Sequence, residues 1–303
     1  MKPPEYPGAV APERRTKISS AGLCLAVYEW GDPAGAPLVL CHGMFDHARA
    51  FDLLAPLLAE RFRVVGFDAR GHGESDWADA YLWPADVADV ATVLEWVGRP
   101  AHLVGHSRGG GLATDAAARA PALVRQLVNI DGFGPPENGS GGPPHFDPDP
   151  PPLPERLGAY LDRRRRAAKL DHWRPHPSLD ALVERRHVQN PRLTREWLRY
   201  LAYHAARETE AGWVWKADPS AGRAFGPWRP EWIAPLWRHL QAPLLAVVGS
   251  EPDTWGPLPE PLLRERLAYV SDVRRASVPG VGHFVHMEAP IPTAQLILEF
   301  LEP

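Results

Sequence analysis

The 303-residue chain is poor in cysteine, with only Cys24 and Cys41. Both stand in apolar, strand-like settings, so we expect buried thiols in a reducing compartment rather than a disulfide. No apolar run is long enough to cross a bilayer. The polar, proline-rich stretch before Lys17 also lacks the apolar core of a signal peptide. These absences favour a cytoplasmic protein with no membrane partner.

A strong excess of one charge is also missing. The formal net charge is -4, from 33 basic and 37 acidic side chains. A balance this even implies neither an acidic nor a basic partner. The largest basic run is Arg163–Arg166, and because it is isolated we interpret it as a solvated helix face. We therefore expect no nucleic-acid partner.

The sequence has no complete signature of a phosphate or metal site. Gly109–Gly111 follows an expected strand and opens a helix, as phosphate loops do, but the G-K-[ST] of a P-loop is absent. No G-x-G-x-x-G stands at the first strand–helix turn. His283 and His286 are close in sequence, yet no carboxylate or cysteine completes a metal site. We expect no cofactor and no metal.

Short apolar runs and helical patterns alternate from residue 15 to residue 131. Continuous apolar runs are typical of strands buried on both faces, and here they end at Cys41, Phe67, Gly105 and Ile130. The alternation predicts an α/β fold, with a parallel sheet and helices on both of its faces. The pattern resumes at residue 241, with strands over 243–249 and 273–278 and a last helix over about 291–301.

Residues 132–240 interrupt this pattern. The stretch 132–154 is rich in proline and glycine and has no periodicity. The remainder predicts helices and no buried strands, with helices near 155–169, 179–188, 194–208 and 230–240. Seven of the twelve tryptophans lie between residues 132 and 240. We predict a core over 15–131 and 241–303, a helical cap over 132–240, and a disordered or loosely attached lead-in over 1–14.

The segment from Gly105 to Gly109 has the form G-x-S-x-G, with Ser107 at its centre. Glycines on both sides remove Cβ atoms that would clash where a strand turns sharply into a helix. Such a turn holds its serine in a strained conformation with the hydroxyl exposed above the sheet. A serine hydroxyl is a weak nucleophile, so it needs a nearby base and the base needs an orienting acid.

His283 is the best candidate for the base, because it follows the last strand in a glycine-flanked loop. Three acids are open. We favour Asp253, which follows the preceding strand, over Asp131, which ends an earlier strand, and over Glu251. His42 is expected to support the loop below the oxyanion site.

Polar residues follow the strands at their carboxyl ends, where open α/β sheets bind ligands. This set is His42, Asp68, Ser107, Asp131, Glu251, Asp253 and His283. Acyl transfer also needs donors for a developing oxyanion. We expect these donors to be the backbone N–H groups of Arg108 and Met44. The Arg108 side chain is expected to form a salt bridge rather than to bind a substrate carboxylate.

In combination, these motifs resemble the serine-dependent, cap-bearing branch of the α/β-hydrolase superfamily. The matching segments are Cys41–Met44, Gly66–Ser75, Gly105–Gly110 and Gly280–Phe284. The resemblance implies an eight-stranded, mostly parallel sheet, a cap inserted after the sixth strand, and a Ser–Asp–His triad without cofactor. Similar haloalkane dehalogenases and soluble epoxide hydrolases place Asp where this chain has Ser107, which argues against both chemistries.

The sequence thus predicts a serine hydrolase that cleaves a small-molecule ester or related acyl bond through an acyl-enzyme. The tryptophan-rich cap suggests a substrate with an apolar or aromatic part. Two alternatives stay open. One keeps the fold but is a C–C bond hydrolase, an acyltransferase, a perhydrolase or a cofactor-free oxygenase, and the other is a non-catalytic ligand-binding protein.

Overall fold

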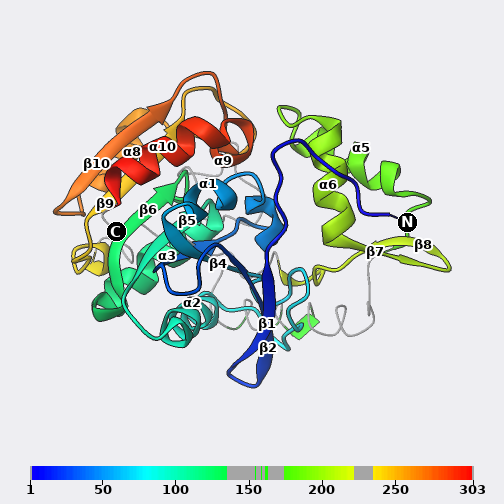
Figure 1. Ribbon diagram of the computed structural model, residues 1–303, viewed down its shortest axis with the longest axis horizontal. Helices are drawn as coiled ribbons and strands as arrows, with labels where there is room; N and C mark the ends of the chain where they lie inside the picture. Colours follow the sequence, from blue (N-terminus) through cyan, green and yellow to red (C-terminus); the bar gives the residue numbers. More distant parts are fainter. Residues whose placement is uncertain are drawn as a thin grey trace.

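The computed structural model describes residues 2–134, 174–221 and 235–301, with the single positions 154, 158, 161 and 162. A sheet of eight strands forms its centre, in the spatial order β1-β2-β4-β3-β5-β6-β9-β10 (Figure 1). β2 pairs antiparallel with β1 and with β4, and all other neighbouring strands are parallel. The expected eight-stranded, mostly parallel sheet is confirmed.

The strands of this sheet are β1 (Arg14–Ser20), β2 (Leu23–Trp30), β3 (Ala36–Cys41), β4 (Phe62–Phe67), β5 (Ala101–His106), β6 (Val124–Ile130), β9 (Leu244–Gly249) and β10 (Val273–Val278). The helices beside it are α1 (Ala55–Ala59), α2 (Trp83–Val97), α3 (Arg108–Arg119), α8 (Glu260–Leu267), α9 (Val285–Glu288) and α10 (Pro290–Phe300), with short 3-10 turns η1 (Ala48–Phe51) and η2 (Pro121–Leu123).

Helices cover both faces of the sheet, because successive side chains of a strand point to opposite faces. In β3, Val39 and Cys41 join the apolar core that contains α2, α3 and α8. Leu38 and Leu40 join the opposite core, which contains α1 and α10. Because both faces of the strands are buried, their sequences are continuous apolar runs.

The two cysteines have different surroundings. Cys41 is buried in the core, whereas Cys24 is exposed, and both are free thiols. Cys24 lies on β2 opposite Ser19 of the edge strand β1. The expectation of two buried thiols is therefore correct only for Cys41, because the β1–β2 hairpin lies at the edge of the sheet.

Residues 174–221, the longest described stretch of the insertion, form a separate layer beside the sheet (Figure 1). Its helices α5 (Leu179–Gln189) and α6 (Arg195–Ala205) lie where helices are expected. The prediction of no strands here is wrong, because β7 (Ala206–Thr209) and β8 (Gly212–Trp215) form an antiparallel hairpin after α6. A positive φ of 123° at Gly212 lets the chain turn back. The helices expected over 155–169 and 230–240 fall largely outside the described residues.

The lead-in packs on the molecule instead of hanging free. The ring of Tyr6 lies 4.9 Å from that of Trp197 on α6. The Val10 N–H donates to the Asp52 carbonyl at 2.9 Å, and Trp30 Nε1–H donates to the Val10 carbonyl at 3.0 Å. This stretch therefore links the insertion to the sheet, and β1 begins at Arg14.

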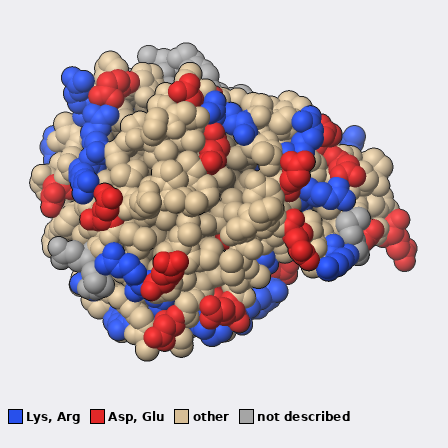
Figure 2. Space-filling model, turned by 45° about the horizontal axis from the view of Figure 1, so that its top comes forward, with Lys and Arg blue, Asp and Glu red and all other residues tan. Residues whose placement is uncertain are grey.

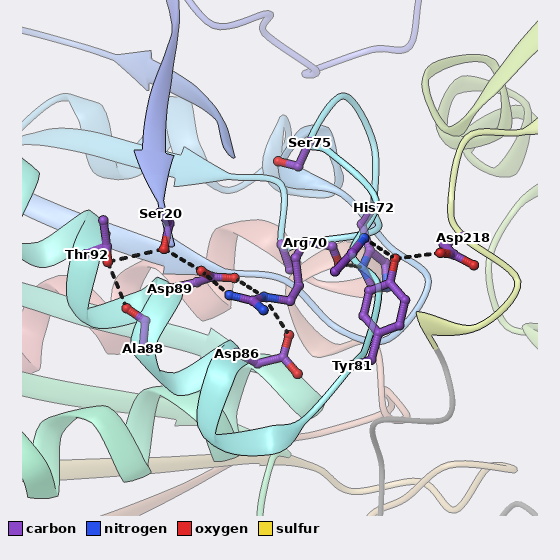
Figure 3. Close-up of polar contacts among 12 residues, drawn as sticks. Ser20, Arg70, His72, Ser75, Tyr81, Asp86, Ala88, Asp89, Thr92 and Asp218 are labelled. Carbon is purple, nitrogen blue, oxygen red and sulfur yellow. Dashed lines mark hydrogen bonds and ion pairs between the residues drawn. The ribbon is translucent and has the colours of Figure 1, made fainter. Parts of the chain in front are cut away.

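Polar contacts fasten the insertion to the loop after β4 (Figure 3). The Tyr81 hydroxyl donates to Asp218 Oδ2 at 2.7 Å, and the Asp218 N–H donates to the Gly71 carbonyl at 2.7 Å. Arg70 makes a bidentate ion pair with Asp89 of α2, at 2.6 and 2.7 Å. The loop after β4 is thereby held between α2 and the insertion.

Charged side chains of both signs lie around the rim of the face in Figure 2, and most of the surface between them is formed by other residues. The basic run Arg163–Arg166 falls outside the described residues. Among the helices that the structure describes, none is long and apolar enough to cross a membrane.

Replacing Tyr81 with phenylalanine tests the attachment of the insertion. The Tyr81→Phe variant loses the hydrogen bond to Asp218 and leaves a buried carboxylate oxygen without that donor. We expect the free energy of unfolding in urea to fall by about 1–2 kcal/mol. Tyr6→Phe is the matched control, since the Tyr6 hydroxyl bonds to no residue in the described ranges, and it should change stability by less than about 0.5 kcal/mol. Equal stability of Tyr81→Phe and wild type would contradict this account.

Candidate active site

Ser107 lies between the end of β5 and the start of α3, in a strained backbone conformation. Its φ is 53° and its ψ is -122°, a region that residues with a side chain rarely adopt. Its N–H donates to the Ile130 carbonyl at 2.9 Å, and its carbonyl accepts from the Gly110 N–H at 2.9 Å. These two hydrogen bonds keep the backbone of Ser107 in its strained conformation. Ser107 is half-buried, whereas its neighbours in β5 and α3 are buried.

Close packing around this turn explains the glycine that follows it. A Cβ at Gly109 would lie 2.2 Å from the Cys41 carbonyl oxygen. No side chain fits at that distance, so glycine lets the first turn of α3 lie directly against the end of β3.

His283 connects two other strand ends to Ser107. Its Nε2 lies 2.9 Å from Ser107 Oγ, and its Nδ1 lies 2.6 Å from Asp131 Oδ2. Asp131 directly follows β6 and is held by its N–H, which donates to the Val247 carbonyl at 2.8 Å. A carboxylate at Nδ1 requires the proton on that nitrogen, which leaves Nε2 free to accept the serine proton.

The favoured acid, Asp253, is not the group on the imidazole. Its Oδ2 instead accepts a hydrogen bond from the backbone N–H of His283 at 2.7 Å. Glu251 accepts from the Ser250 hydroxyl at 3.0 Å. In the structure the alternative acid Asp131, not the favoured Asp253, is the carboxylate that bonds to the imidazole. The physical reason is strand order, since β6 is the neighbour of β5 and its last residue ends beside the serine turn.

The electrostatics of His283 differ from those of the histidines around it. Burial lowers its pKa, but the hydrogen bond and charge of Asp131, followed by the charge of Asp253, outweigh burial and raise it. Burial is the main cause that lowers the pKa of His42, His72 and His106. His283 is thus the one among these four with its charged form favoured.

Two backbone donors lie on the loops expected to hold an oxyanion. The N–H groups of Met44 and Arg108 donate to no acceptor among the residues that the structure describes. Arg108 is the first residue of α3, where N–H groups have no partner within the helix. His42 supports the Met44 loop, since its Nε2 accepts from the Ala69 N–H at 3.0 Å and its Nδ1–H donates to the Gly43 carbonyl at 2.7 Å.

The side chain of Arg108 points to α2. Its Nη2 lies 2.6 Å from Asp86 Oδ2, and both side chains are 1% exposed. This is the expected salt bridge. Within the described ranges, no three His, Cys, Asp or Glu side chains gather as metal ligands.

Comparison of the sequence and the fold with known proteins shows which family the chain belongs to. The model of the family described as "Alpha/beta hydrolase family" matches residues 38–296. The chain belongs to this family. A 3-hydroxybutyrate-oligomer hydrolase of Cupriavidus necator is 30% identical, over 88% of this chain and 89% of that protein.

Other α/β hydrolases are similar over most of the chain. A serine hydrolase-like protein of Dictyostelium discoideum is 25% identical, over 92% of this chain and 79% of that protein. The structure of a thioesterase domain from the curacin biosynthetic pathway superposes with a TM-score of 0.79 at 23% identity, covering 94% of this chain and 99% of that domain. With the family, the two hydrolase relatives from Cupriavidus and Dictyostelium identify the protein as a hydrolase.

One residue at the site is missed by sequence reasoning. A Cβ at Gly256 would lie 2.3 Å from Asp131 Oδ2 and 3.1 Å from His283 Nδ1. In the loop after β9, Gly256 therefore packs directly against the hydrogen bond between Asp131 and His283. The Gly-Pro pair at 256–257 signals a turn, but nothing in the sequence indicates what the turn touches.

Gly256→Ala tests this close contact. The added methyl group must push Asp131 and His283 apart, since 2.3 Å is far inside van der Waals contact. We expect the wild type to give a strongly downfield NMR resonance for the His283 Nδ1–H proton and Gly256→Ala to lose it. Gly158→Ala is the control, because a methyl group there meets no described atom within 4 Å. An unchanged resonance in Gly256→Ala would refute the contact.

Proposed function

We propose that the protein is a serine hydrolase that cleaves an ester or related acyl bond of a small molecule through an acyl-enzyme on Ser107. The observation that carries this proposal is the continuous hydrogen-bond chain from Ser107 Oγ through His283 to Asp131. It supplies a nucleophile, a base and an orienting acid in the geometry that acyl transfer needs.

In the first step, Ser107 Oγ attacks the substrate carbonyl carbon while His283 Nε2 takes the hydroxyl proton. The carbonyl oxygen becomes negative and accepts hydrogen bonds from the N–H groups of Met44 and Arg108. The tetrahedral intermediate collapses as His283 returns the proton to the leaving oxygen. Asp131 keeps the proton on Nδ1 and stabilises the imidazolium.

In the second step, water replaces the alcohol. His283 removes a proton from the water as the water attacks the acyl carbon. The second tetrahedral intermediate releases the acid, and the proton returns to Ser107 Oγ. Residues 132–240 are the cap in this proposal, and their described stretch 174–221 lies beside the sheet.

The names of the relatives favour an acyl bond over the other chemistries of the fold. Oligomers of 3-hydroxybutyrate are oligoesters, and a thioesterase also cleaves an acyl bond. Acyl transfer to thiol, alcohol or peroxide needs the same first step, so acceptor assays separate hydrolysis from transfer. C–C bond cleavage and non-catalytic binding do not require turnover of simple esters, so the ester hydrolysis assay of the wild type described next bears on both.

Hydrolysis of p-nitrophenyl esters of graded acyl length tests the proposed function. We expect turnover by the wild type, with the preferred chain length reporting the size of the pocket. Ser107→Ala should reduce kcat by about 10⁴-fold or more, because the acyl-enzyme can no longer form. Absence of turnover across the panel, or undiminished turnover by Ser107→Ala, would contradict the proposal.

Asp131→Asn tests the assignment of the acid. The amide keeps the size of the side chain but favours the wrong tautomer of His283, so we expect kcat to fall by about 10⁴-fold. Glu251→Gln is the control, since it removes a carboxylate from the loop after β9 without touching the imidazole, and it should retain nearly full activity. Retained activity in Asp131→Asn would rule out this acid.

A further inference from the structure

We propose that Asp253 is a positioning residue for His283, acting on the main chain of the histidine while Asp131 acts on its imidazole. This inference rests on the proposed function, because His283 needs a fixed position only if it serves Ser107. It assigns a separate task to each of the two carboxylates beside one histidine.

The first observation is the direct bond from Asp253 to the histidine backbone. Asp253 Oδ2 accepts from the His283 N–H at 2.7 Å. This is a charge-assisted hydrogen bond, stronger than one between neutral groups. The loop after β10 has no regular secondary structure at His283, so this bond helps to fix the backbone that carries the imidazole.

The other carboxylate oxygen of Asp253 organises its own loop. Oδ1 accepts from the Trp255 N–H at 2.7 Å, and the Asp253 N–H donates to the Gly256 carbonyl at 2.8 Å. The turn closed by these bonds brings Gly256 onto the Asp131–His283 pair. Asp253 therefore also controls the backbone that covers this pair.

The main chain of His283 is held on its other side by a second group. His106 Nε2–H donates to the His283 carbonyl at 3.0 Å. Burial lowers the pKa of His106 and so favours its neutral form, and the contact with a carbonyl requires a proton on Nε2. With N–H and carbonyl both bonded, rotation of the His283 peptide units is restricted.

The charge of Asp253 has a further effect on the imidazole. Although burial lowers the pKa of His283, the bond and charge of Asp131 and then the charge of Asp253 raise it. Removing the Asp253 charge should lower this pKa. A residue that served the fold alone would leave the pH dependence of the reaction unchanged.

The test uses Asp253→Asn and Asp253→Ala with a fluorophosphonate probe, whose reaction with Ser107 needs His283 but no known substrate. Asn keeps one oxygen acceptor without the charge, and Ala removes both acceptors. A displacement of about 1 Å at a reacting group costs up to about 100-fold. We expect labelling to slow about 10-fold in Asp253→Asn and about 100-fold in Asp253→Ala, with the acid limb of the pH–rate profile at lower pH in both.

Three further measurements make the outcome decisive. On the best ester, kcat should fall while KM stays within about twofold, since a positioning residue acts through His283 and not through a contact of its own with the substrate. Glu251→Gln, the matched control on the same loop, should label at the wild-type rate with the wild-type acid limb. Thermal unfolding identifies variants that do not fold, and if Asp253→Ala fails to fold, Asp253→Asn decides alone.

The failure of this inference is distinct from the failure of the proposed function. If the wild type is not labelled at Ser107, the proposed function falls and this inference falls with it. If the wild type is labelled and both Asp253 variants react at its rate, only the positioning role is overturned. Slower labelling with an unmoved acid limb would also overturn it, because Asp253 would then act on the fold alone.

Discussion

The structure around the site depends on one constraint: His283 must contact Ser107 and Asp131 at the same time. Its two imidazole nitrogens lie 2.9 Å from Ser107 Oγ and 2.6 Å from Asp131 Oδ2. β5 and β6 are neighbours, so Ser107 and Asp131 are brought together by the sheet itself, whereas β9 separates β10 from β6. His283 therefore reaches the other two only through the loop that follows β10, and the bonds from Asp253 and His106 hold that loop.

A carboxylate partner divides the buried histidines near the strand ends into two groups. His42, His72 and His106 lack a carboxylate hydrogen bond, and burial lowers the pKa of each. Each of them bonds through a ring nitrogen to a main-chain carbonyl, at Gly43, Arg70 and His283. The carboxylates around His283 reverse this trend, so the positive charge of the reaction, in the proposed mechanism, develops at one imidazole.

Much of the fold could be predicted from sequence because each parallel strand is buried on both faces. β10 has the expected bounds. The serine turn could be predicted because the glycines around Ser107 are needed only where the chain packs closely. Which carboxylate bonds to the His283 imidazole could not be predicted. Asp131 and Asp253 both follow strands, and only the spatial order of β5, β6, β9 and β10 shows which of them reaches the imidazole. The β7–β8 hairpin could not be predicted for a different reason. Its two strands have four residues each, which is too short for an alternating pattern to be told apart from a helical one.

The most direct test of the central claim is to locate a covalent adduct by peptide mapping and mass spectrometry after reaction with a fluorophosphonate. The account predicts one adduct per chain, on the peptide that contains Ser107, and none on Ser107→Ala. An unmodified wild-type chain, or an adduct on a different serine, would contradict it.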